Sequence, residues 1–120
     1  MFSVDAATAA AVDTENAVVL AGREITHLNC TVPSRCSEIK WEYFDLHLKQ
    51  FETIFHTLVN IIDRFKAQFS VSDSDGACRL HIRNITTHNA GEYECKNMTG
   101  GRDLKKTSLT VIGSQNQITR

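Results

Sequence analysis

The chain has 120 residues, a length that suits one domain with a single hydrophobic core. Hydrophobic residues make up 42% and charged residues 22%, a balance that excludes a disordered or low-complexity chain. The formal net charge is -1, so the chain lacks the basic excess that typifies nucleic-acid-binding proteins. No stretch approaches the roughly 18 consecutive apolar residues of a transmembrane helix, and we expect no membrane insertion by this segment.

The N-terminal residues 1–15 are small and polar without a sustained period, which predicts a tail or a loosely held first strand. Branched residues at 18–20 and 25–32 predict short β-strands on either side of a turn at Gly22. Apolar and charged residues then alternate, as in strands with one buried face, at 39–43, 80–83, 93–96 and 109–111.

One segment has the period of a helix instead. Apolar residues recur at three- and four-residue steps from Phe51 to Phe69, and this periodicity alone predicts an amphipathic helix over about 50–68. Polar clusters such as 72–76 mark the turns between the other elements. The residues 73–76 resemble part of a calcium loop but lack its final glutamate, so we expect a turn there.

Four cysteines are the strongest compositional signal: Cys30, Cys36, Cys78 and Cys95. They include no C-x-x-C pair and no clustered histidine partner of the zinc-site kind, so we expect no metal and no other cofactor. An even number of cysteines without metal-site spacing favours two disulfides and an oxidising, extracellular environment.

The histidines do not predict a catalytic or metal site either. They are scattered along the chain, at His27, His47, His56, His81 and His88. No nucleophile elbow, H-E-x-x-H motif or glycine-rich phosphate loop accompanies them. We therefore expect exposed polar residues at these positions and a protein that is not an enzyme.

A long-range motif identifies a family resemblance. Trp41 follows Cys30, and Cys95 is preceded by N-A-G-E-Y-E at 89–94. This Cys…Trp…Cys arrangement resembles the immunoglobulin superfamily. The runs T-I-F-H at 53–56, I-I-D-R-F at 61–65 and L-H-I-R-N-I at 80–85 look like strands C′, D and E of V-type domains.

The resemblance covers about 18–112 and implies strands in place of the helix over 50–68. The expected fold is an all-β, V-type immunoglobulin sandwich of two antiparallel sheets, A-B-E-D and G-F-C-C′. We place this domain at 16–113, between the N-terminal tail at 1–15 and a C-terminal tail at 114–120.

The resemblance also implies roles for the core residues. Cys30 and Cys95 are expected to bridge the sheets, Trp41 to pack on that bridge, and Tyr93 to cap a corner. In V-type domains the B-C loop, which here carries Cys36, lies beside the start of strand E. A second disulfide between Cys36 and Cys78 follows from this topology.

Three departures from the family pattern are visible. Asn89 stands where the family has an aspartate, so its partnership with Arg64 can be at best a hydrogen bond. Strand B is one residue longer than usual, which leaves its register open. The F-G-x-G positions of strand G read Asp103-Leu104-Lys105-Lys106, after a short connection at Gly100-Gly101 that suits a tight hairpin. These features argue against a rearranged antigen receptor.

Three N-glycosylation sequons begin at Asn29, Asn84 and Asn97. Because Cys30 points inward, Asn29 is expected to point outward from strand B. A glycan there would cover the A-B-E-D face and leave the opposite sheet free.

The resemblance implies an extracellular recognition or adhesion domain of an immune-type receptor. We expect it to bind another immunoglobulin-type domain, a second copy of itself included, and an invertebrate V-type immune receptor is one candidate. The alternative is a soluble pattern-recognition module that binds glycan or microbial ligands through its loops. The B-C loop residues Pro33, Ser34, Arg35 and Ser37 favour that alternative weakly.

The expected partner face is the outer surface of G-F-C-C′. Strand alternation places four side chains there: Glu42, Phe44, Glu94 and Lys96. Family pairing sets Glu42 beside Lys96 and Phe44 beside Glu94, and in a dimer Glu42 or Glu94 would meet Lys96 of the other copy. Leu46, Leu48 and Phe51 would extend this patch, or would fold inward to close the core.

Overall fold

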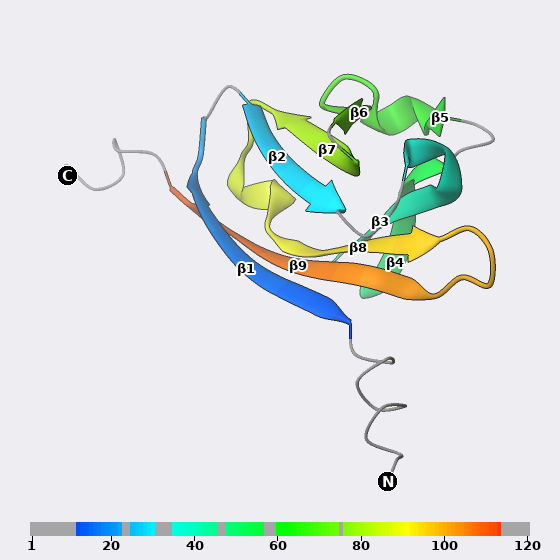
Figure 1. The fold of residues 1–120 in the computed structure, drawn as a ribbon. Helices are drawn as coiled ribbons and strands as arrows, with labels where there is room; N and C mark the ends of the chain where they lie inside the picture. Colours follow the sequence, from blue (N-terminus) through cyan, green and yellow to red (C-terminus); the bar gives the residue numbers. More distant parts are fainter. Residues whose placement is uncertain are drawn as a thin grey trace, which may run out of the picture.

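The computed structural model describes residues 12–22, 25–30, 35–45, 48–56, 60–74 and 76–113. In them, two sheets pack as an all-β sandwich, as the sequence predicts (Figure 1). The strands are β1 Asp13–Leu20, β2 Ile25–Cys30, β3 Ile39–Asp45, β4 Gln50–His56, β5 Asn60–Ile61, β6 Phe69–Ser74, β7 Ala77–Arg83, β8 Gly91–Asn97 and β9 Asp103–Ile112. Single 3₁₀ turns lie at η1 Cys36–Glu38, η2 Asp63–Phe65 and η3 Thr87–Asn89. None of the helices in these ranges is long and apolar enough to cross a membrane.

The larger sheet has the strand order β1-β9-β8-β3-β4-β5, and the smaller has the order β2-β7-β6. Neighbouring strands are antiparallel except β1, which runs parallel to β9 from Asp13 beside Lys105 to Leu20 beside Ile112 (Figure 1). The family pattern A-B-E-D predicts a first strand beside strand B, and for β1 this prediction is wrong. β9 would otherwise present an unpaired edge, and β1 covers that edge with a continuous backbone ladder.

The first described strand begins earlier than the predicted start of the domain at residue 16. β1 begins at Asp13, inside the segment 1–15 that was expected to be a tail or a loose strand. Residues 1–11 and the expected C-terminal tail at 114–120 lie outside the described residues.

The region with helical periodicity forms β4, β5 and the 3₁₀ turn η2 instead of a helix. Ile54 and Phe55 are buried, while Phe51 stays largely exposed, so the apolar residues do not share one face. Pairing of β4 with β3 places Phe55 beside Trp41 and thereby in the core. Pairing of β4 with β3 therefore decides the secondary structure here, although the spacing of the apolar residues has the period of a helix.

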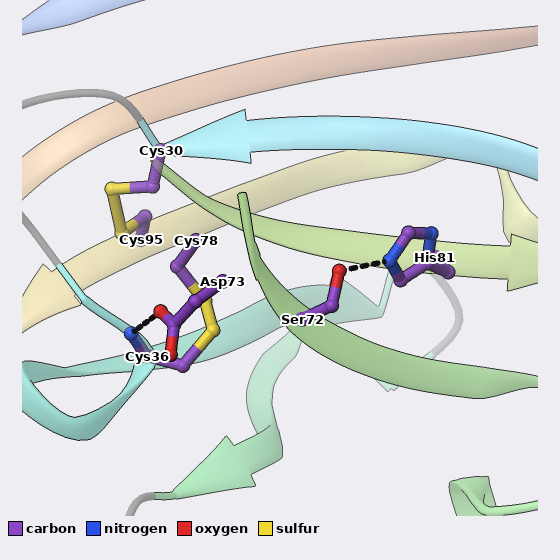
Figure 2. Close-up of a disulfide and its surroundings, with 7 residues drawn as sticks. All are labelled: Cys30, Cys36, Ser72, Asp73, Cys78, His81 and Cys95. Carbon is purple, nitrogen blue, oxygen red and sulfur yellow. Dashed lines mark hydrogen bonds between the residues drawn. A yellow bond between two sulfur atoms is a disulfide. The ribbon is translucent and has the colours of Figure 1, made fainter. Parts of the chain in front are cut away.

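The disulfide between Cys30 and Cys95 joins the two sheets at the centre of the core (Figure 2). Trp41 is fully buried in the same core. In the chain-entropy model, closing a loop of sequence separation 65 contributes about 4 kcal/mol. Tyr93, two residues before Cys95, donates its hydroxyl proton to the carbonyl of Asn89 at 2.6 Å.

The second disulfide joins Cys36 to Cys78 and fastens η1 to the start of β7 (Figure 2). Beside it, the backbone N–H of Cys36 donates to Asp73 Oδ1 at 2.7 Å. Both cysteine pairs are those expected from the sequence. Asn89, in contrast, bonds to the side chain of Gln68, while Arg64 pairs with Glu52.

Candidate functional site

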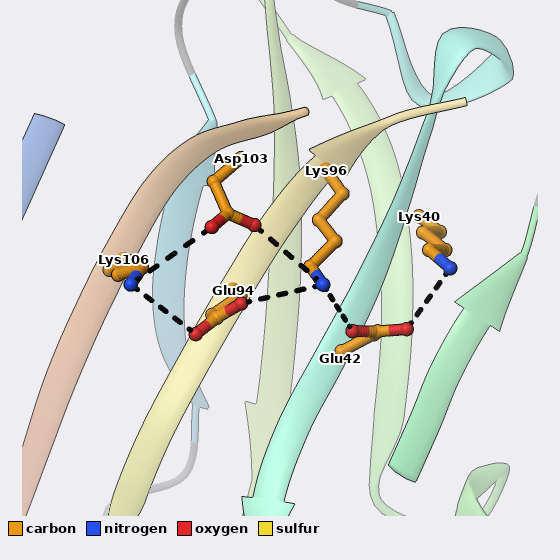
Figure 3. Close-up of polar contacts among 6 residues, drawn as sticks. All are labelled: Lys40, Glu42, Glu94, Lys96, Asp103 and Lys106. Atoms are coloured by element: carbon orange, nitrogen blue, oxygen red, sulfur yellow. Dashed lines mark ion pairs between the residues drawn. The ribbon is translucent and has the colours of Figure 1, made fainter. Parts of the chain in front are cut away.

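The outer face of the larger sheet is the side that points away from β2, β7 and β6. Trp41 and Tyr93 point into the core, and alternation along β3 and β8 sends the four predicted side chains outward: Glu42, Phe44, Glu94 and Lys96. Figure 3 shows Glu42, Glu94 and Lys96 together on this side of the strands. The outward direction of these side chains is therefore the one that their sequence pattern predicts.

The pairing across this face differs from the expected one. Glu42 lies opposite Glu94, Lys40 opposite Lys96, and Phe44 opposite Glu92. Neither expected pair is directly opposed in the register: Glu42 still contacts Lys96, as a diagonal neighbour, whereas the expected pair of Phe44 with Glu94 is wrong. The core sets this register, because it places the fully buried Trp41 opposite Cys95, and a slip by one residue would turn the buried side chains of one strand outward.

Six side chains form what we call the charged network: Lys40, Glu42, Glu94, Lys96, Asp103 and Lys106 (Figure 3). Lys96 Nζ lies 3.1 Å from Glu42 Oε1 and 3.8 Å from Glu94 Oε1, so one ammonium serves both opposed carboxylates. Lys40 Nζ lies 3.1 Å from the other oxygen of Glu42. The contacts of Glu94 are longer than those of Glu42, so its charge is compensated less well.

The two glutamates are much less accessible than expected, with 9% of Glu42 and 3% of Glu94 exposed. Burial raises the pKa of Glu42, but hydrogen bonds and charge from Lys40 and Lys96 outweigh it and the net pKa is lowered. For Glu94, burial together with the charges of Asp103 and Glu92 raises the pKa to about 7. Glu42 is thus ionised at neutral pH, while Glu94 is poised between its two forms.

Next to the network lies an apolar group that we call the aromatic patch: the paired rings of Phe44 and Phe51, with Leu48 in the turn that joins their strands. The rings of Phe44 and Phe51 meet edge to face with centroids 4.9 Å apart, and Lys96 Nζ lies 5.5 Å from the centre of the Phe51 ring. Leu48 is 58% exposed and Phe51 42% exposed, so these two do not fold inward to close the core. Leu46 lies outside the described residues.

A second exposed apolar group lies on β1 and β9. It consists of Val18, Leu20 and Ile112, and Leu20 and Ile112 are neighbours across the parallel pair. Val18 is the most exposed of the three, at 61%.

The outer face of the smaller sheet carries a contact that sequence spacing does not reveal. His27 on β2 lies opposite His81 on β7, with the two Nδ1 atoms 2.7 Å apart. Ser72 Oγ lies 2.7 Å from the Nε2 of His81 (Figure 2). Partial burial, His27 and the arginines Arg79 and Arg83 all lower the pKa of His81. Only the register of β2 with β7 could have predicted this pair, because the residues are far apart in the chain.

The sequon asparagines differ in environment. Asn29 is half-buried on the outer side of β2, between the inward-facing Leu28 and Cys30. Asn84 is exposed, with a φ of 47° at the end of β7. Asn97 is half-buried, and its Oδ1 accepts a hydrogen bond from the N–H of Thr99. Their glycosylation stays a prediction.

The loop expected for glycan recognition is described only in part. Arg35 and Ser37 are exposed, while Pro33 and Ser34 lie outside the described residues. Within the described ranges, no group of three or more His, Cys, Asp or Glu side chains is arranged to hold a metal ion.

Comparison of the chain with protein-family models and with curated proteins finds no match.

Proposed function

We propose that this chain is a V-type immunoglobulin domain of an extracellular immune-type or adhesion receptor. Strands β4 and β5 extend the β9-β8-β3 sheet as C′ and C″ extend the corresponding sheet of variable-type domains. The buried Trp41 in the core with the inter-sheet disulfide, and the hydrogen bond of Tyr93 two residues before Cys95, support the same assignment. Two disulfides support an oxidising, extracellular location.

The domain binds a second immunoglobulin-type domain through the outer face of the larger sheet. The observation that carries this proposal is the exposed aromatic patch beside the charged network. Interface centres combine large apolar side chains with a surrounding polar rim. Here Phe51 and Leu48 provide the apolar part, and the partly exposed lysines at 40, 96 and 106 provide the rim.

A second copy of the chain is the partner that fits this face. A two-fold interface brings the same patch of both copies together and needs both signs of charge on each. Asp103 is 29% exposed and Lys106 38% exposed, so the rim offers both signs. Glu42 and Glu94, in contrast, are almost completely buried beneath the lysines of their own chain, and they do not supply the cross-interface pairs expected from the sequence.

The test compares Phe51→Glu with Val18→Glu by sedimentation over a concentration series. Both substitutions put one carboxylate at an exposed apolar position of the same sheet, but Val18 lies on β1, away from the patch. We expect the parent and the Val18→Glu variant to dimerise alike and Phe51→Glu to stay monomeric. Phe51 is preferred to Phe44, whose half-buried ring would confound association with folding.

Thermal unfolding of each variant, measured in parallel, separates loss of association from loss of the fold. A parent that stays monomeric up to millimolar concentration would rule out self-association. Equal dimerisation of the parent and Phe51→Glu would rule out this face.

A further inference from the structure

The His27 and His81 pair on the outer face of the smaller sheet belongs neither to the core nor to the proposed partner face. The two rings lie at directly opposed positions of β2 and β7, with centroids 4.6 Å apart and an interplanar angle of 83°. Their Nδ1 atoms are 2.7 Å apart, which is hydrogen-bond distance. We propose that His27 and His81 form a binding site for a divalent transition-metal ion of the Cu²⁺, Ni²⁺ and Zn²⁺ group, coordinated by both Nδ1 atoms.

Proton positions around the pair support this assignment. Two imidazole nitrogens at 2.7 Å share one proton, which one donates and the other accepts. When the Nε2–H of His81 donates to Ser72 Oγ, the Nδ1 of His81 carries a lone pair that accepts from His27. A bound metal ion takes the place of this shared proton. The proton moves through solvent to Nε2 of His27, and both Nδ1 lone pairs then meet the ion without a net change in protonation.

The distance between the nitrogens suits one metal ion. Imidazole nitrogens bind Zn²⁺ at about 2.0–2.1 Å, which places two neighbouring ligand nitrogens about 3 Å apart. The observed 2.7 Å is shorter than this and belongs to a head-on hydrogen bond, so metal binding requires both rings to turn until their Nδ1 lone pairs converge on one ion. Water molecules complete the coordination, because the site is on the outer surface of the sheet.

Ligand chemistry selects the class of ion. Neutral imidazole suits Cu²⁺, Ni²⁺ and Zn²⁺, with Cu²⁺ the tightest, whereas Ca²⁺ and Mg²⁺ prefer oxygen ligands. Ser72 acts as a positioning residue, because its hydrogen bond to Nε2 fixes the ring and the tautomer of His81. The arginines Arg79 and Arg83 act electrostatically on His81 and repel a cation, so we expect moderate affinity that increases with ionic strength.

The test titrates the whole chain with Cu²⁺ in a non-chelating buffer, followed by calorimetry. Three variants are compared with the parent: His27→Ala, His81→Ala and the control His88→Ala, whose histidine is exposed on η3. We expect saturable binding of one ion per chain in the parent and in His88→Ala, and its loss in both other variants. Circular dichroism verifies that each variant is folded.

Ring ¹⁵N spectra of the Zn²⁺-loaded protein give a second readout. We expect both histidines to be ligated through Nδ1 with a proton on Nε2, and Ser72→Ala to weaken binding about tenfold without changing the ligating atom. Saturable binding that survives in folded His27→Ala and His81→Ala would overturn the proposal. Ligation through Nε2, or binding lost equally in His88→Ala, would overturn it as well.

Discussion

Glu42 and Glu94 lie directly opposite each other on β3 and β8, and both are almost completely shielded from solvent. Like charges at opposed positions destabilise a sheet unless they are compensated. Lys40 and Lys96 hold Glu42 in its charged form, whereas Glu94 lies among weaker contacts and its pKa rises to about 7. The pair therefore divides into one fixed charge and one group that titrates near neutrality.

This division predicts a dependence of stability on pH. Because the pKa of Glu94 is about 7 in the folded chain and near 4.5 when exposed, the folded state binds more protons between these values. The contribution of Glu94 to the free energy of unfolding should therefore fall as pH rises from about 5 to about 7 and level off above that. His81, whose pKa is lowered, contributes in the opposite sense as it loses its proton. Glu42, with a lowered pKa, also acts in the opposite sense to Glu94, and its contribution is lost only in more acidic solution.

Urea denaturation of the Glu94→Gln variant between pH 5 and pH 8 tests this assignment. The variant should lose most of the decline and should exceed the parent in stability at pH 8. Glu38→Gln is the control and should keep the decline, because Glu38 is exposed on η1 and is not among the charges that shift the pKa of Glu94. Parallel pH profiles for the parent and Glu94→Gln would show that Glu94 does not titrate in this window.

Removal of the disulfide between Cys36 and Cys78 should destabilise the domain without unfolding it. The bond closes a loop of sequence separation 42, for which the chain-entropy model gives about 4 kcal/mol as an upper value. The double variant Cys36→Ala, Cys78→Ala should lose about 2–4 kcal/mol in chemical denaturation. Peptide mapping without reduction should recover Cys36 linked to Cys78 in the parent, and a peptide linking Cys30 to Cys36 would contradict the fold.

The hydroxyl of Tyr93 should matter more to stability than that of Tyr43. Tyr93 is 1% exposed and donates to Asn89 O at 2.6 Å, while Tyr43 donates to Ala90 O at 3.1 Å from a half-buried position. We expect Tyr93→Phe to cost about 1–2 kcal/mol, because a buried carbonyl is left without this donor, and Tyr43→Phe to cost less. Equal losses in thermal denaturation would contradict this ranking.

Gly91 should tolerate no larger residue. A Cβ at this position would lie 2.9 Å from Tyr43 Cε1 and 3.2 Å from the carbonyl oxygen of Phe44, and the φ of +146° is already strained for other residues. Gly101→Ala is the control, because it has a φ of +66° but no atom within 4 Å of the added Cβ. We expect Gly91→Ala to cost clearly more than the roughly 1–2 kcal/mol of backbone strain alone. A smaller loss than in Gly101→Ala would contradict the packing argument.

The core could be predicted because its signals are local. Cys30, Trp41, Tyr93 and Cys95 stand in short recognisable contexts, and each takes the expected place in the sandwich. The outward direction of Phe44 and Lys96 followed from simple alternation along their strands.

What could not be predicted depends on strand pairing between distant segments. A shift of register changes every directly opposed neighbour, so Phe44 was expected opposite Glu94 and lies opposite Glu92, and the opposed carboxylates Glu42 and Glu94 were not foreseen. The contact of His27 with His81 required the register of β2 and β7. The partnership of β1 with β9 required knowing that the outer edge of β9 was open.

The parallel alignment of β1 with β9 has a mechanical consequence. A force that pulls the start of β1 away from the end of β9 acts along both strands, and it loads their hydrogen bonds in shear, all at once. Both strands lie outside the loop that Cys30 and Cys95 close. Tension would therefore have to break the β1–β9 hydrogen bonds together before the chain can lengthen. The residues between Cys30 and Cys95 would not extend afterwards, because the disulfide carries the force past them.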